Sequence, residues 1–255
     1  MNVTKTKIVC AEISADTFVN ALMEFSTSEN QQNAKRFFKT GIGEYGEGDL
    51  FIGVRNGPVN ALAKAYINLP LCEIEKLLKN PIHEVRSGAL GIMDYQARRK
   101  MTSESRRNEL FDLYFKNHQY INNWDLVDKA APSIVGGYLF NKERDILLKI
   151  VQSKNLWERR TAIVSTLFFI RQNDIRFTFI LANLLLNDHH DLIHKATGWM
   201  LRSAGDKNKK ALLQFLDTTA DRMPRTMLRY CLEHLSNQER TYYMALKKTK
   251  MNSME

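Results

Sequence analysis

The segment 122–128 reads Asn-Asn-Trp-Asp-Leu-Val-Asp and holds the residue pair with the clearest chemical potential. Trp124 and Asp128 are four residues apart, so in a helix they share one face. An indole ring beside a carboxylate can hold a cation, because the ring face and the negative charge attract it together. The alternative is a core tryptophan next to a solvated or ion-paired aspartate, and for this segment in isolation that alternative is favoured.

Two adjacent arginines follow in the segment 156–163. Arg159 has the same place in an Arg-x-x-Ala-Ile pattern as Arg86 has in Arg-x-x-Ala-Leu, which indicates a structural role for both. Arg160 lies one position further round the helix, so we expect it to point elsewhere and to be free for function. Its planar guanidinium would suit a phosphate, since it can pair two oxygens at once. The alternative is an ordinary exposed arginine.

A third segment, 194–202, contains Gly198 followed by Trp199. A glycine inside a helix costs about 1 kcal/mol relative to alanine, so its presence predicts close approach of a neighbouring element. Trp199 could lie on an inner, functional surface. It could equally pack in the core, because Leu192 and Ala196 occupy the same helix face.

A literal Gly-x-Gly-x-x-Gly pattern occurs at Gly41, Gly43 and Gly46. A dinucleotide site needs this pattern between a strand and a helix, with its amides facing phosphate. No strand pattern precedes it, and Glu44 and Glu47 add negative charge that repels phosphate. We interpret the segment as a flexible loop.

His189, His190 and His194 are clustered, and the last two have a spacing that can present both imidazoles to a metal. No glutamate follows His190 in the manner of a zinc protease motif, and no third ligand is evident. We therefore interpret the cluster as a solvated helix start, and we expect no metal and no cofactor.

Apolar residues recur at helical spacing along almost the whole chain, and two-residue alternation is scarce, which predicts an all-α protein. Several boundaries are also predicted: a helix start after a capping Asn155, an interruption at Pro132, a first helical turn containing Pro58, and a helix end at Gly205. Residues 40–56 carry five glycines and form the longest expected loop. The clearest apolar stripes are Phe18, Val19, Leu22 and Met23; Ile146, Leu147, Ile150 and Val151; and Phe177, Ile180, Leu181, Leu184 and Leu185.

The arginine patterns belong to a weak repeat of roughly 30–40 residues, the range of helix-pair solenoids. Each pair cannot bury its apolar face alone, so stacked pairs make one continuous core and a curved surface. We expect residues 1–255 to form a single α-solenoid, with the helical assignment of 1–40 less clear. Trp124, Asp128, Arg160 and Trp199 fall on three successive repeat units and would line one concave groove.

The composition indicates which class of partner the protein could bind. The 255 residues are 44% hydrophobic and 25% charged, as in globular proteins, and 37 Lys and Arg against 28 Asp and Glu leave a net charge of +9. A basic surplus favours binding to a polyanion, although an ordinary basic protein is an equal alternative. Three separated cysteines, Cys10, Cys72 and Cys231, indicate reduced, buried thiols.

Targeting signals are not evident in the sequence. The first eleven residues lack the apolar core of a signal peptide, and the longest apolar stretch, 177–186, is about half a membrane span. We expect an intracellular protein that is not associated with a membrane.

Taken together, the segments resemble the AlkD family of DNA alkylation repair enzymes, which are HEAT-like helical glycosylases. The matching stretches read Trp-Asp-x-Val-Asp (124–128), Arg-Arg-Thr-Ala-Ile (159–163) and Lys-Ala-x-Gly-Trp-x-Leu-Arg (195–202). Further matches are Tyr-Gly-x-Gly-Asp (45–49) with Gly-Val (53–54), and Met-Pro-Arg (223–225). The resemblance extends over nearly the whole chain after about residue 43.

The resemblance implies a role for particular residues. The catalytic carboxylate of the family falls on Asp128, its two active-site tryptophans fall on Trp124 and Trp199, and its functional arginine falls on Arg160. The third stretch ends at Arg202, which we also expect to contact DNA. None of the four active-site positions is substituted, so nothing suggests an inactive member.

The implied reaction is hydrolytic excision of N3- and N7-alkylated purines from double-stranded DNA, with the lesion captured against a concave surface without a deep base pocket. A non-catalytic HEAT scaffold that binds DNA or protein is the main alternative. A nuclease is a further alternative, but it would need clustered carboxylates to bind two metals, and the sequence shows no such cluster. No lysine is placed by motif to form a Schiff base, so we expect no lyase activity. With this function we expect a cytoplasmic monomer that associates with the nucleoid through DNA.

Overall fold

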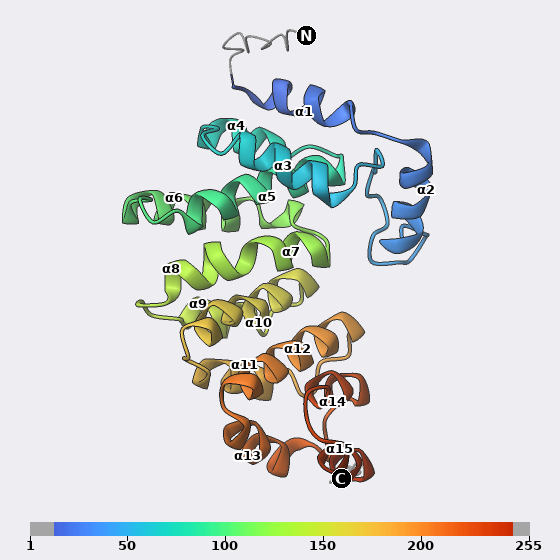
Figure 1. The fold of residues 1–255 in the computed structure, drawn as a ribbon, viewed down its shortest axis with the longest axis vertical. Coiled ribbons are helices and arrows are strands. Elements are labelled where there is room, and N and C mark those ends of the chain that lie inside the picture. The colour runs from blue at the N-terminus through green and yellow to red at the C-terminus, as the bar shows by residue number, and fades with distance from the viewer. Residues whose placement is uncertain (1–12, 247–255) are drawn as a thin grey trace, which may run out of the picture. The chain divides into compact units, whose positions relative to one another are not determined.

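The computed structural model describes residues 13–246, and its regular secondary structure in that range consists of helices (Figure 1). No strand forms among these residues, where β pairing is limited to an isolated bridge between Leu50 and Ile82. The prediction of an all-α protein built from stacked helices is therefore confirmed. In chain order the helices are α1 (Ala15–Met23), α2 (Ser28–Phe37), α3 (Asn56–Ala65), α4 (Leu71–Leu78), α5 (His83–Arg98), α6 (Glu104–Lys116), η1 (His118–Tyr120), α7 (Trp124–Ala131), η2 (Pro132–Gly136), α8 (Gly137–Leu139), α9 (Asp145–Ile150), α10 (Leu156–Arg171), α11 (Arg176–Leu184), α12 (Asp191–Lys207), α13 (Lys209–Thr219), α14 (Arg225–Cys231) and α15 (Asn237–Ala245).

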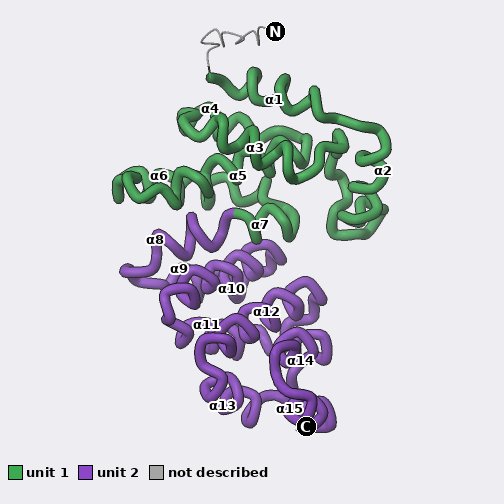
Figure 2. The backbone as a smooth tube through the Cα atoms, viewed as in Figure 1, with its two compact units in different colours: residues 1–129 green, residues 130–255 purple. Residues whose placement is uncertain are grey.

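The chain divides into two compact units, residues 1–129 and 130–255, with the boundary inside α7 (Figure 2). In the first unit α5 is the central helix and packs against α3, α4 and α6. The ring of Phe18 from α1 lies against α5 at Gly88, where a Cβ atom would clash with it. Close packing at this glycine buries Phe18 completely.

The glycine-rich segment 40–55 contains no helix, as predicted, and a carboxylate holds its last part in place. Glu84 of α5 accepts hydrogen bonds from the backbone N–H groups of Ile52 (3.2 Å), Gly53 (2.8 Å) and Val54 (3.2 Å). Gly53 has a φ of 80°, and a Cβ there would meet the backbone of α2. The glycine is needed both for its left-handed conformation and for this close approach.

In the second unit α12 packs against α10 on one side and α14 on the other. Gly198 lies where α12 meets α14: a Cβ atom would come within 2.5 Å of both the Met227 carbonyl oxygen and Tyr230 Cβ. The close approach predicted from this glycine is confirmed.

The repeated arginines make equivalent contacts within their own units. Arg86 donates to the carbonyl oxygens of Asn80 (3.0 Å) and Pro81 (2.9 Å), which precede it by six and five residues. Arg159 donates in the same register to Ser153 (2.9 Å) and Lys154 (3.1 Å). Each guanidinium also binds a buried aspartate, at 2.6 Å: Asp49 for Arg86 and Asp188 for Arg159. Their predicted structural role is confirmed.

One predicted helix boundary needs correction. Gly205 does not end α12, which continues to Lys207; the missing Cβ of this glycine instead leaves room for Leu212. The predicted interruption at Pro132 is confirmed: the α-helical part of α7 ends at Ala131, and the chain continues through the π-helical η2 into α8. The wider π turn accommodates a residue that has no N–H to donate. The starts after Asn155 and near Pro58 are confirmed.

Some predicted burial is also wrong. Ile180 and Leu184 are 39% and 45% exposed, because α11 buries the face with Thr178, Leu181 and Ala182 instead. Cys231 is buried, which raises the pKa of its thiol to about 12, but Cys72 is exposed. Cys10 lies outside the described residues. Within the described range, no helix combines the length and apolar character needed to cross a bilayer.

Candidate active site

Helix α7 begins at a buried asparagine that anchors it to the first unit. Asn123 Oδ1 accepts from the Trp124 backbone N–H (2.8 Å), and the Asn123 carbonyl accepts from Val127 N–H (3.2 Å). The amide of Asn123 also donates to Asp49 Oδ2 (3.3 Å). These bonds fix the first turn of the helix, from which Trp124 projects.

Trp124 and Asp128 line one cleft of about 410 Å³ in the first unit, so the prediction that they share a helix face agrees with the structure. Three acidic side chains line the cleft, and Arg98 pairs with one of them, Asp94, at 3.1 Å. The arrangement suits a planar cationic group, which would lie between an indole ring and carboxylates. The remaining lining residues are Asn56, Asn60, Gly91, Tyr95, Asp125 and Lys129.

Lys129 is a cleft residue that the sequence did not indicate. Its Nζ donates to Ser87 Oγ (2.6 Å) and Asn60 Oδ1 (3.2 Å). Burial lowers the pKa of its ammonium group, although the charges of Asp125 and Asp94 raise it in part. A lysine directly after Asp128 has no distinctive spacing, so its burial becomes visible only when α3 and α5 are in place.

Trp124 also belongs to an aromatic cluster. Its ring centroid is 5.7 Å from those of Phe37 and Phe38, both near the end of α2. Phe38 stacks in turn on Phe51 at 5.0 Å. The cluster holds the indole by contacts between residues that are far apart in the sequence.

Beneath this cluster, His83 is held between two carboxylates. Its Nδ1 lies 3.2 Å from Asp49 Oδ2 and its Nε2 lies 2.9 Å from Asp125 Oδ2. Burial lowers the pKa of His83, but the charge of Asp125 and the hydrogen bonds to both carboxylates outweigh it and raise the pKa overall. Burial raises the pKa of Asp49, yet the His83 hydrogen bond and the charge of Arg86 lower it to about 2. The network favours an imidazolium between two carboxylates.

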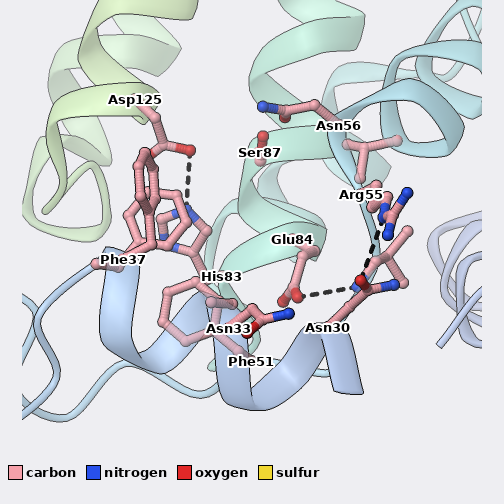
Figure 3. Close-up of a pocket in the computed structure, with 14 residues that line it drawn as sticks. Asn30, Asn33, Phe37, Phe51, Arg55, Asn56, His83, Glu84, Ser87 and Asp125 are labelled. Atoms are coloured by element: carbon pink, nitrogen blue, oxygen red, sulfur yellow. Dashed lines mark hydrogen bonds and ion pairs between the residues drawn. The ribbon is translucent and has the colours of Figure 1, made fainter. Parts of the chain in front are cut away.

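A second cavity, of about 470 Å³, lies in the same unit and shares Asn56 and Asp125 with the cleft. Figure 3 shows Asn30, Asn33 and Phe37 of α2 facing His83, Glu84 and Ser87 of α5 across it. Sequence reasoning did not find this cavity, because its walls come from five separate segments.

The other predicted site residues lie in the second unit. Arg160 is only 5% exposed, and its Nη1 donates to the carbonyl oxygen of Leu192 in α12 (2.6 Å). The expectation that Arg160 is unconstrained is wrong, because the start of α12 packs over it. Trp199 on α12 is half-buried, and Arg202 forms an ion pair with Glu233.

The remaining motifs are explained by local structure. Gly41 N–H donates to Glu44 Oε2 (2.9 Å) and Gly43 N–H to Glu47 Oε2 (2.8 Å), so the loop's own carboxylates occupy the amides that a phosphate would need. His190 is the N-cap of α12 and accepts from Leu192 N–H at 3.2 Å, as expected for a helix start.

Comparison with known proteins agrees with these features. A solved structure described as a predicted DNA alkylation repair enzyme from Enterococcus faecalis has the same fold, with a TM-score of 0.66 and 17% identity, over 83% of this chain and 97% of that one. A search of curated proteins finds no match. Residues 18–235 match the sequence model of the family described as DNA alkylation repair enzyme. The chain therefore belongs to the DNA alkylation repair enzyme family, and its role is in DNA repair.

Proposed function

We propose that the protein is an AlkD-type, HEAT-like DNA glycosylase that excises N3- and N7-alkylated purines by hydrolysis of the N-glycosidic bond. The observation that carries this proposal is the cleft in which Trp124 and Asp128 lie together, in a chain of the DNA alkylation repair enzyme family. An acidic cleft beside an indole ring matches the positive charge of the alkylated nucleotide.

Alkylation at N3 or N7 makes the purine cationic, so the base leaves without prior protonation. The bond between C1′ and the base nitrogen breaks, and its electron pair neutralises the base. Positive charge then develops on the sugar, as in other glycosyl transfers. Asp128 stabilises that charge and positions a water molecule, whose oxygen bonds to C1′ while its proton passes to the carboxylate or to solvent. No cofactor takes part.

The other predicted residues hold the substrate. Trp124 contacts the cationic nucleotide through its ring face, and we assign the same role to Trp199. We assign to Arg160 a contact between its guanidinium and the backbone phosphate. Arg202 exchanges its Glu233 partner for a phosphate, and the net charge of +9 supports binding of double-stranded DNA.

The test is base release from DNA that carries N7-methylguanine or N3-methyladenine. Asp128→Asn keeps the shape of the side chain but removes its charge, and we expect it to lower the rate of release at least about 100-fold. Asp145→Asn, at an exposed aspartate of α9, is the matched control and should keep the parental rate. Equal release by Asp128→Asn and the parent would refute the mechanism.

Product analysis separates the alternatives. A monofunctional glycosylase leaves an intact strand with an abasic site. A non-catalytic scaffold would bind the same DNA, release no base and tolerate Asp128→Asn.

A further inference from the structure

The turn that joins α5 to α6 concentrates positive charge (Figure 1). Residues 98–107, the basic turn, hold five cationic side chains and one carboxylate, that of Glu104. Met101, in the middle of the basic turn, is 93% exposed, so the turn is open to solvent. A charge cluster of this kind attracts a polyanion, because each phosphate that it neutralises releases counterions. The cations are Arg98, Arg99, Lys100, Arg106 and Arg107.

The basic turn lies at one end of the candidate active-site cleft. Arg98, the last residue of α5, lines this cleft, where its Nε lies 3.1 Å from Asp94 Oδ2. Gly91 lines the same cleft and precedes Arg98 by seven residues, which is about 10 Å along the helix. About three base steps of duplex DNA cover that distance. A duplex that presents a nucleotide to Asp128 therefore brings phosphates only a few nucleotides away to the turn.

Two of the arginines also line a small cavity of about 210 Å³ beside the turn. Arg99 Nη1 donates to Asn68 Oδ1 (3.1 Å). Arg106 donates through Nη2 to Gln96 Oε1 (2.9 Å) and through Nη1 to Glu109 Oε2 (3.1 Å). An arginine has five N–H donors, and among the described residues these bonds use one donor of Arg99 and two of Arg106. The remaining donors suit the oxygens of a phosphate group.

Hydrogen bonds hold the basic turn in one conformation. Arg107 of α6 donates to the carbonyl oxygens of Ala97 and, at 3.0 Å, of Arg99. Gln96 is only 5% exposed and donates to two carbonyl oxygens of the loop after α3 (2.8 and 3.1 Å). Its own carbonyl accepts from Thr102 Oγ1 (2.6 Å). A cationic surface whose backbone is already ordered loses little further conformational entropy when it binds DNA.

We propose that the basic turn, residues 98–107, binds the phosphate backbone of duplex DNA beside the lesion. Arg98 contacts a phosphate at the end of the cleft, Lys100 adds charge next to it, and Arg99 and Arg106 hold a phosphate further along. The inference rests on the proposed function, because it places the damaged nucleotide in the cleft. A lesion that is captured without a base pocket leaves much of the affinity to contacts with the backbone.

The first experiment measures how binding depends on salt. The full-length Asp128→Asn protein is titrated with a short duplex that carries one N7-methylguanine, and with the same duplex undamaged, at several salt concentrations. Arg98→Gln combined with Lys100→Gln should weaken binding at least about tenfold and lower the slope of log Kd against log salt by about 0.9 for each lost phosphate contact. Both duplexes should show this loss, because a backbone contact does not read the base. A loss confined to the damaged duplex would overturn the proposal.

A matched control removes the same charge from another surface of the first unit. Lys76 on α4 and Lys116 on α6 have side chains that are 66% and 67% exposed, and they line neither the cleft nor the cavity at the turn. Lys76→Gln combined with Lys116→Gln should leave Kd and the slope close to those of the parent. If both pairs of substitutions weaken binding equally, net charge alone explains it and no contact exists at the turn. Thermal denaturation checks that each variant folds.

The second experiment locates the contact on the DNA. In a set of duplexes with the same lesion, one phosphate at a time is replaced by an uncharged methylphosphonate. The Asp128→Asn protein should bind more weakly when the replacement lies within about three nucleotides of the lesion on one side. Adding Arg98→Gln and Lys100→Gln should cause no further loss at that position, since the two partners of one contact are not additive. Losses that add at every position contradict the proposal.

The two proposals can fail separately, because binding is measured without chemistry. If the parent releases no base but the salt and phosphate effects appear, the glycosylase mechanism is refuted and the contact at the basic turn stands. If the parent releases base while the turn variants bind DNA like the Asp128→Asn protein, the glycosylase stands and the contact is refuted.

Discussion

The imidazole of His83 lies 2.9 Å from the carboxylate of Asp125, and this contact joins the central helix of the first unit to the turn that carries the candidate chemistry. Asp125 lies directly after Trp124 and one helical turn before Asp128. On its other side His83 meets Asp49, which also binds Arg86 at 2.6 Å. The position of α7 on α5 therefore depends on a chain of buried charges.

This network of buried charges makes the stability of the protein depend on pH. The pKa of His83 is raised above its ordinary value of 6.5. The protonated imidazole therefore contributes fully to the free energy of unfolding below pH 6.5, and this contribution is lost as the pH rises through the higher pKa of the folded state. We expect the melting temperature to fall over that alkaline range. In His83→Gln this slope should disappear, and the protein should lose about 3–5 kcal/mol at neutral pH, because Asp125 and Asp49 both lose the imidazolium between them and only Asp49 keeps its ion pair with Arg86. Parallel melting curves of His83→Gln and the parent would contradict the assignment.

The carboxylate of Asp49 predicts the opposite dependence of stability on pH, a loss of stability in acid. Its pKa is lowered to about 2, so its contribution is present above the ordinary value of 3.8 and is lost as the pH falls through about 2. Asp49→Asn should flatten this acid transition, as measured by circular dichroism during acid titration. The exposed Asp16→Asn variant is the control and should leave the transition in place.

The repeat register predicts which arginines matter for stability. Arg86→Leu leaves Asp49 buried with one cation fewer and frees two carbonyl oxygens, so we expect a loss of about 3–5 kcal/mol in urea denaturation. Residues 225–228 read Arg-x-x-Leu, a looser form of the same pattern, and Arg225 is exposed. Arg225→Leu should cost no more than about 1 kcal/mol. Equal losses would mean that the pattern does not mark a structural position.

Lys129 provides a test of the hydrolytic mechanism. A buried amine of lowered pKa beside Asp128 resembles the nucleophile of a lyase, which would form a Schiff base with the abasic sugar. Its Nζ is instead bonded to Ser87 and Asn60, so we expect it to act in packing and charge balance. Borohydride reduction during base release should trap no covalent protein–DNA adduct. An adduct that forms with the parent and is lost in Lys129→Met would replace hydrolysis by lyase chemistry.

Local patterns in the sequence predicted the helices and the structural role of Arg86 and Arg159, because helical periodicity and the Arg-x-x-Ala motif each extend over only a few residues. They also placed Trp124 and Asp128 on one face. They did not predict the burial of Arg160, which depends on α12 packing over α10, or the contacts of His83, which join segments 34 and 42 residues away. The second cavity was not predictable for the same reason, since its walls come from five separate segments of the chain.

Gly198 shows how one such tertiary contact can be measured. Alanine in its place should gain about 1 kcal/mol in helix propensity, yet its Cβ would come within 2.5 Å of the Met227 carbonyl oxygen and of Tyr230 Cβ. Because α12 and α14 would have to separate, we expect Gly198→Ala to destabilise the protein by about 1–3 kcal/mol in urea denaturation. A Gly198→Ala protein as stable as the parent would show that α12 and α14 tolerate a wider spacing than their packing indicates.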